Sequence, residues 1–289
     1  PIRLGDAVGT AVSFAGTGGR LRVTGGAEPV ITNTRGFALG NSVVGILEVL
    51  PGLQIVQSAG NSSVGNAGAT LRLAGGGEWF LNGNTALITV AAGGNLQIAG
   101  GSTLAANNTT PGALAFGGIA GTLQFNGGTL RLDANLANDM AVSTGTLSLN
   151  GGGNLLLNSA ATANDAQITF TAISRSNQGT LVITVANATG ALGTGAPADA
   201  QGRVFSTTNG AGTLAQVTNG IVAPYVVRTA SPTDRAAQFV TYDAINGLQG
   251  YAGAAVATLN GAQAGSIADI LSAQALIGNN EIYAVRTSA

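Results

Sequence analysis

The segments GTLQFNGG at residues 121–128 and GTLSLNGG at residues 145–152 follow one pattern, in which Gly-x-Leu-x-apolar precedes a pair of glycines. Looser copies of this pattern occur four times earlier in the chain: GRLRVTGG at 19–26, GILEVLPG at 45–52, ATLRLAGG at 69–76 and GNLQIAGG at 94–101. Measured at the central leucine, successive copies are 26, 24, 25, 27 and 24 residues apart. Recurrence at a period of about 25 residues indicates a repeat protein whose units stack on one another.

Each period contains two further short segments in which apolar residues alternate with others. Trp79-Phe80-Leu81 is an example of this second segment, and Ile88-Thr89-Val90 is an example of the third. Gly, Asn, Ser and Thr bound these segments, which is typical of strands. Three short strands per period predict an all-β protein, a single-stranded parallel β-helix (β-solenoid) with three-strand rungs of about 25 residues. We expect regular rungs over residues 1–160 and a less regular continuation over 161–289, including a cap or an interface region.

Stacking of rungs at the interstrand distance brings equivalent residues of successive copies into columns. The central leucines are expected to form an inward column: Leu21, Leu47, Leu71, Leu96, Leu123 and Leu147. The residue after each leucine then faces outward, and Arg22, Glu48 and Arg72 occupy this position in three successive copies. Their alternating charges predict a stacked Arg–Glu–Arg ladder. A ligand-binding stripe is the alternative interpretation, but pairing of surface charges, which stabilises little, is favoured.

The composition removes many classes of functional site. The chain of 289 residues has no His and no Cys, and all 11 of its cationic residues are Arg. Zinc, haem and iron–sulfur centres, Ser-His-Asp and Cys nucleophiles, and the lysine of phosphate-binding loops are therefore excluded. A net charge of −1 gives no electrostatic basis for nucleic-acid binding, and no apolar run is long enough to predict a membrane-spanning helix. We expect no cofactor and no metal, although carboxylate chemistry and calcium binding remain as alternatives.

One pair of acidic residues could be brought together by stacking. Asp139 and Asp165 are 26 residues apart, about one rung, and both precede a third segment. Such a pair could bind Ca²⁺ or act as an acid–base couple. Both residues lie in the sequence Ala-Asn-Asp, however, where capping of a turn by the carboxylate is the favoured interpretation. For Trp79, a sugar-stacking platform is the alternative to burial in the core, which is favoured.

Residues 120–251 carry a resemblance to a known family. The relevant runs are GTLQFNGGTLRLDANLANDMAV at 121–142, GTLSLNGGGNLLLN at 145–158, ISRSNQGTLVI at 173–183, NGIVAPYVV at 219–227 and FVTYDAINGLQGY at 239–251. This part of the chain resembles the autotransporter-associated β-strand repeat family, and the last two runs are similar to the segment that commonly follows its repeats. The resemblance implies a secreted or surface-displayed bacterial β-solenoid, often a portion of a very large passenger protein. It brings no catalytic motif.

These features predict an extracellular or cell-surface structural protein and not an enzyme: a β-solenoid building block of a bacterial surface layer or fibre. The terminal rungs of a β-helix leave strand edges unpaired, so we expect copies to associate head to tail or by strand donation. The absence of Cys fits an extracellular location, and the start at Pro1 indicates a processed form or a fragment. An adhesin that binds glycans or cells through one face is the alternative function, and a polysaccharide lyase or hydrolase is less favoured.

Overall fold

The computed structural model consists of strands and the turns between them, and the described part of the chain contains no helix. The residues that it describes are 2–4, 12–14, 18–24, 30–40, 44–65, 68–82, 86–107, 116–134, 140–159, 165–186, 192–193, 202–206, 217–229, 237–253, 257–260, 262–270 and 281–287.

Most strands belong to two large sheets. Sheet A has 11 strands, in the order β1 (Ile2–Leu4), β4 (Val30–Asn33), β7 (Gln54–Gln57), β10 (Glu78–Asn82), β13 (Thr103–Asn107), β15 (Gly128–Ala134), β17 (Gly153–Ser159), β19 (Leu181–Ala186), β21 (Val226–Thr229), β22 (Gln238–Asp243) and β23 (Gly247–Gly250). Sheet B has 12 strands: β2 (Val12–Phe14), β3 (Gly18–Val23), β5 (Phe37–Leu39), β6 (Val44–Val49), β8 (Gly60–Val64), β9 (Thr70–Ala74), β11 (Ala86–Val90), β12 (Asn95–Ala99), β14 (Phe116–Asn126), β16 (Met140–Asn150), β18 (Ala166–Ser176) and β20 (Gly202–Ser206). A separate sheet contains β24 (Ile267–Ile270) and β25 (Ala284–Thr287).

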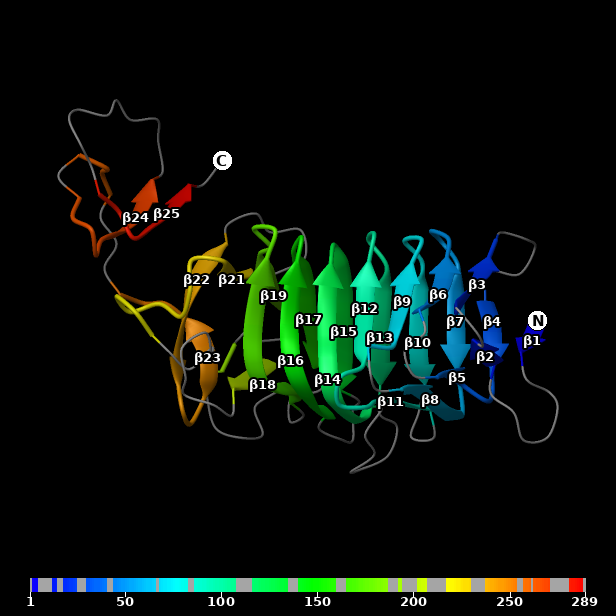
Figure 1. Ribbon diagram of the computed structural model, residues 1–289. Coiled ribbons are helices and arrows are strands. Elements are labelled where there is room, and N and C mark those ends of the chain that lie inside the picture. The colour runs from blue at the N-terminus through cyan, green and yellow to red at the C-terminus, as the bar shows by residue number, and fades with distance from the viewer. Residues whose placement is uncertain are drawn as a thin grey trace.

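Each rung of the solenoid contains one strand of sheet A and two segments in sheet B (Figure 1). In β14, β16 and β18 the two sheet B segments merge into single strands of 11 residues. Val44 pairs with Thr70 and Met140 pairs with Ala166, both in parallel, so neighbouring rungs are about 26 residues apart. The predicted all-β parallel solenoid with three-strand rungs is confirmed.

The core of the solenoid is filled by alternate residues of every strand. On β10, Trp79 and Leu81 are fully buried, whereas Phe80 between them points outward and is partly exposed. The Trp79 ring contacts the ring of Phe37 on β5 edge to face, with centroids 5.3 Å apart. Burial of side chains of this size contributes about 1.5–3 kcal/mol each. The alternative role of Trp79 as an exposed sugar-stacking platform is therefore wrong.

The predicted leucine column is interrupted at one step. Leu21 pairs with Leu47, but Leu47 pairs with Leu73 and not with Leu71. The remaining leucines pair in the predicted sequence: Leu71 with Leu96, Leu96 with Leu123, and Leu123 with Leu147. All these leucines are fully buried except Leu21, which is partly buried against the core.

The same two-residue offset separates the predicted charge ladder. Arg22 pairs with Glu48, but Glu48 lies opposite Ala74, and Arg72 lies opposite Ile46. The offset is absorbed at the corner between the sheets, because six residue steps lead from Glu48 to Gln54 but only four from Ala74 to Glu78, although both pairs are in register. The longer corner contains Pro51, and spacing between leucines cannot reveal on which side of a corner the extra residues lie.

The two ends of the solenoid differ. We call the sheet edge on the side of the N-terminal rungs the upstream edge and the opposite one the downstream edge. Among the described residues, β1, β2 and β3 pair only with β4, β5 and β6, so their upstream edges have no partner. At the downstream end, sheet A turns back into the antiparallel strands β22 and β23, and β23 lies beside β20 of sheet B.

Side chains and turns of β22 and β23 close the downstream end. The Tyr242 hydroxyl donates to the Ser206 carbonyl at 3.1 Å and accepts from the Ser206 N–H at 3.3 Å, so it occupies the backbone groups at the end of β20. Gly247, at a φ of +75°, packs so closely against β20 that a Cβ would lie 2.3 Å from the Val204 carbonyl oxygen. Beyond this end, β24 and β25 form their parallel sheet and pack on a small cluster that includes Ile221 and Phe239.

Candidate functional site on sheet A

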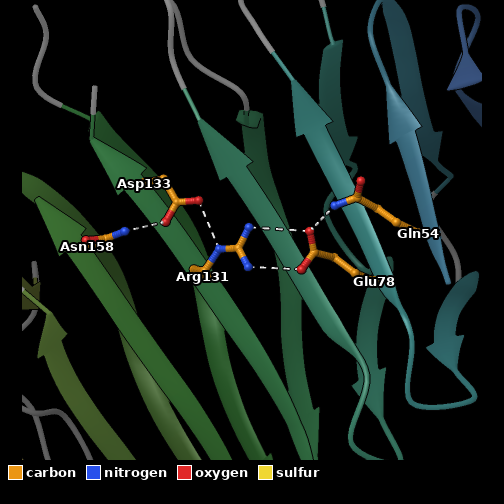
Figure 2. A network of polar contacts seen from close by, with 5 residues as sticks. All are labelled: Gln54, Glu78, Arg131, Asp133 and Asn158. Carbon is orange, nitrogen blue, oxygen red and sulfur yellow. Dashed lines mark hydrogen bonds and ion pairs between the residues drawn. The ribbon is translucent and has the colours of Figure 1, made fainter. Parts of the chain in front are cut away.

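A network of five polar side chains crosses the outer face of sheet A (Figure 2). The Arg131 guanidinium donates from Nη1 to Glu78 Oε2 at 2.9 Å and from Nη2 to Glu78 Oε1 at 3.3 Å. Its Nε donates to Asp133 Oδ2 at 2.9 Å. Amides extend the network at both ends: Gln54 donates to Glu78 at 2.5 Å and Asn158 donates to Asp133 at 3.2 Å. The network thus joins β7, β10, β15 and β17.

The strand register explains how Arg131 reaches Glu78 across an intervening strand. Ala105 of β13 lies between Phe80 of β10 and Arg131 of β15 in one row. Ala105 occupies an outward position yet is fully buried, and its small side chain leaves room for the arginine to cross. The guanidinium carbon lies 5.8 Å from the centroid of the Phe80 ring, so the arginine also makes a cation–π contact on its way.

The charged groups of the network are shielded from solvent by one another. The exposed fractions of the side chains are 27% for Arg131, 19% for Glu78 and 23% for Asp133. Burial alone would lower the pKa of Arg131, but the charges of Asp133 and Glu78 and their hydrogen bonds outweigh it and raise this pKa. Arg131 therefore stays protonated, and the three charges sum to −1.

This arrangement suits cross-linking of strands better than acid–base chemistry. Both carboxylates accept from the same guanidinium, and each also accepts from a neighbouring amide. A general acid or base needs a carboxyl group that can exchange its proton with a substrate, and pairing with arginine opposes protonation. Within the described residues, no group of three acidic side chains is placed to hold a metal ion.

A shallow depression of about 310 Å³ adjoins the network where the chain turns from sheet B into sheet A. It exists because glycines form this corner: Gly76 has a φ of +87°, and a Cβ on Gly77 would lie 2.4 Å from the Leu50 carbonyl oxygen. Gln54, Glu78 and Thr103 line it with aligned polar side chains from three successive rungs. Its size and polarity would fit a small polar group such as a sugar hydroxyl.

The residues that the sequence singled out lie elsewhere. Asp165 forms a buried ion pair with Arg203, whose Nε donates to Asp165 Oδ2 at 2.8 Å, so its carboxylate is held by an arginine. Asp139 lies outside the described residues. The Arg22 Nε is 3.2 Å from Glu48 Oε2, and Arg20 shares the same oxygen at 3.7 Å. Arg72 is not part of this cluster.

Sequence reasoning missed the Arg131 network, although a signal for it exists. Arg131 is 53 residues after Glu78, which is two rungs plus two residues, because Glu78 aligns with Thr103 and then with Thr129. Aligning the second segments of every rung would have placed both residues on the same face of sheet A. It would not have shown that the arginine leans over Ala105 to reach the earlier rung.

Comparisons with protein-family models, with curated proteins and with solved structures find no match for this chain. The resemblance to the autotransporter-associated repeat family therefore remains an expectation based on the quoted residues. In the part of the chain that the structure describes, no helix has the length and apolar character needed to cross a membrane.

Proposed function

We propose that this protein is an extracellular structural protein, a β-solenoid building block of a bacterial surface layer or fibre that associates with copies of itself. The observation that carries the proposal is the difference between the two ends of the solenoid. The upstream edges of three parallel strands have no partner among the described residues, whereas the downstream end is closed by β22 and β23. Unpaired edges of this kind are templates for another strand.

The outer surface supports a structural role because its polar side chains bond to their equivalents on neighbouring rungs. Gln97 donates to Gln124 at 2.7 Å, and Asn154 donates to Thr129 at 3.4 Å. Together with the Arg131 network, these contacts use the polar groups of the surface to connect strands. The absence of Cys and the family resemblance support an extracellular bacterial location.

Self-association is tested by sedimentation velocity over a hundredfold range of protein concentration, combined with negative-stain electron microscopy. We expect rods of constant width whose length grows with concentration. A protein that stays monomeric over the whole range, and that shows single short particles, would contradict the proposal. Labelling of intact cells with an antibody against the protein tests the location, and labelling that needs permeabilised cells would count against it.

An adhesin is the second candidate, and the depression beside Glu78 favours it. Partly exposed Phe80 lies on the same strand, so a sugar could contact the polar lining and the ring together. A glycan array probed with the protein, and with the E78A and F80A variants, tests this function. Binding that both substitutions abolish would support it. A polysaccharide lyase or hydrolase is less favoured, since Arg131 pairs with both carboxylates of the network.

A further inference from the structure

The open edge of β3 has a defined polarity. Val23, whose side chain is buried, points its carbonyl at the next rung and accepts from the Leu50 N–H. Ala69 in the β9 rung does the same toward Asn95. Inward-facing residues of sheet B thus direct their peptide groups downstream, and outward-facing residues direct theirs upstream. Because the direction alternates along a strand, Arg20 and Arg22 present their N–H and C=O groups at the upstream edge of β3.

Strand β25 offers an edge of the opposite polarity. The Ser266 carbonyl accepts from the N–H groups of Tyr283 and Ala284, so the peptide groups at 266, 268 and 270 face β25. By the same alternation, Val285 directs its N–H and C=O away from β24, toward an edge that has no partner among the described residues. The Val285 side chain is 46% exposed, whereas Ala268, its partner on β24, is fully buried.

We propose that the downstream edge of β25 in one copy pairs in parallel with the upstream edge of β3 in the next copy. This inference rests on the proposed self-association and names the strands that carry it. Figure 1 shows β25 and β3 at opposite ends of the chain, so the pairing is head to tail and each junction leaves one further β25 and one further β3 free. An interface of this kind is heterologous and generates a filament unless the rotation closes a ring.

Both partners gain from the junction. A two-stranded sheet is marginal in water, and β3 would supply β25 with a third strand. Val285 would continue the inward columns of sheet B, which end at the partly buried Leu21 and at Val23. The exposed apolar side chain of the donor strand would then be covered by the open end of the acceptor core.

Charge selects the register of the junction. Arg20 and Arg22 have side chains that are 59% and 55% exposed and share the single carboxylate of Glu48, so the acceptor strand carries excess positive charge. Pairing Val285 with Leu21 would place Arg286 opposite Arg22, and like charges directly opposite are destabilising. Pairing Val285 with Val23 places Ala284 opposite Arg22 instead. It also brings the exposed Glu281, which precedes β25, next to Arg20.

Two proline variants test the junction in the full chain. V285P removes the donor N–H, and R22P removes an acceptor N–H; neither N–H is used by the neighbouring strand of its own copy. Each variant alone should associate at least about tenfold more weakly than the unmodified protein, since each loses hydrogen bonds at the junction. An equimolar mixture should form dimers and stop there, because V285P keeps its β3 and R22P keeps its β25. D269P is the matched control, because its N–H lies on the opposite edge of β24, and it should associate normally.

The outcomes separate this inference from the proposed function. If the unmodified protein associates but V285P and R22P associate equally well, the β25–β3 junction is wrong while self-association stands. If the unmodified protein never associates, both are wrong. Thermal unfolding followed by circular dichroism shows whether each variant still folds, and an R22Q variant, which lacks the charge but keeps the N–H, isolates the backbone contribution. Dimers in the mixture that do not form in either sample alone are the result that supports the junction.

Discussion

Replacement of Arg131 by Ala should weaken the solenoid by more than a typical surface substitution. The guanidinium makes ion pairs with Glu78 and Asp133, which contribute about 0.5–1 kcal/mol each for partly exposed groups. Its contact with Phe80 adds about 0.5–1 kcal/mol. The two carboxylates, with side chains 19% and 23% exposed, would lose their counter-charge, at a cost of about 1 kcal/mol. We expect the R131A substitution to lower the free energy of unfolding by about 2–4 kcal/mol.

Urea unfolding followed by tryptophan fluorescence measures this loss. Trp79 is the only Trp in the chain, is fully buried, and is next to Glu78 on β10, so its emission reports on the rung to which the arginine is tied. R22A is the matched control, because Arg22 pairs with Glu48 from a side chain that is 55% exposed, and its loss should be about 0.5 kcal/mol. R131K keeps the charge but offers no planar fork, so it should recover less than half of the loss. An R131A variant as stable as R22A would refute the argument.

Three further substitutions probe the ends and the interior. G247A places a Cβ 2.3 Å from a backbone oxygen of β20 and should lower the free energy of unfolding by about 2–3 kcal/mol, whereas G52A, at a similar positive φ but in open space, should lose only about 1 kcal/mol in the same urea titration. D165A should cost about 3 kcal/mol because it leaves Arg203 buried without its carboxylate, and an R203M/D165A double variant should recover part of that loss. Burial alone would raise the pKa of Asp243, but hydrogen bonds from the β22–β23 turn outweigh it and lower this pKa. The folded pKa is thus below the unfolded one, so this stabilisation should be present above about pH 4 and be lost as the pH falls through the folded pKa; D243N should abolish that part of the acid sensitivity, as measured by unfolding at several pH values.

The fold was accessible from the sequence because its main determinant is a period. Alternating apolar residues define each strand, and equal spacing of Leu71, Leu96, Leu123 and Leu147 defines the stacking, so both are visible without coordinates. The step from Leu47 to Leu73 was not accessible. The corner with Pro51 is two residues longer than the next corner, and a leucine spacing of 24 residues conceals a strand offset of 26.

The candidate site was less accessible because it depends on side-chain reach. Glu78 and Arg131 are not equivalent positions of adjacent rungs, so no column of aligned residues contains both. Their contact requires a long side chain, a small Ala105 beneath it and the Phe80 ring beside it. The polarity of the open edges was also hidden, since it follows from the direction of individual peptide groups and not from residue type.

The contacts of the arginines offer a physical reason why this chain uses Arg and contains no Lys. Arg131 donates from three nitrogens to carboxylates on two strands that a third strand separates. Arg175 donates Nε to the Gly179 carbonyl while its guanidinium lies 4.5 Å from the centroid of the Tyr225 ring. Parallel rungs repeat at a spacing of about 4.8 Å, so acceptors on neighbouring strands stand at fixed intervals to both sides of an outward side chain. A planar group with five donors can serve several of these acceptors and an aromatic ring at once, whereas a compact ammonium on a flexible stem acts as a point charge and is more strongly hydrated. On a surface whose polar groups connect one rung to the next, arginine is therefore the cation that stabilises the stack, and replacement by lysine keeps the charge but loses the connection.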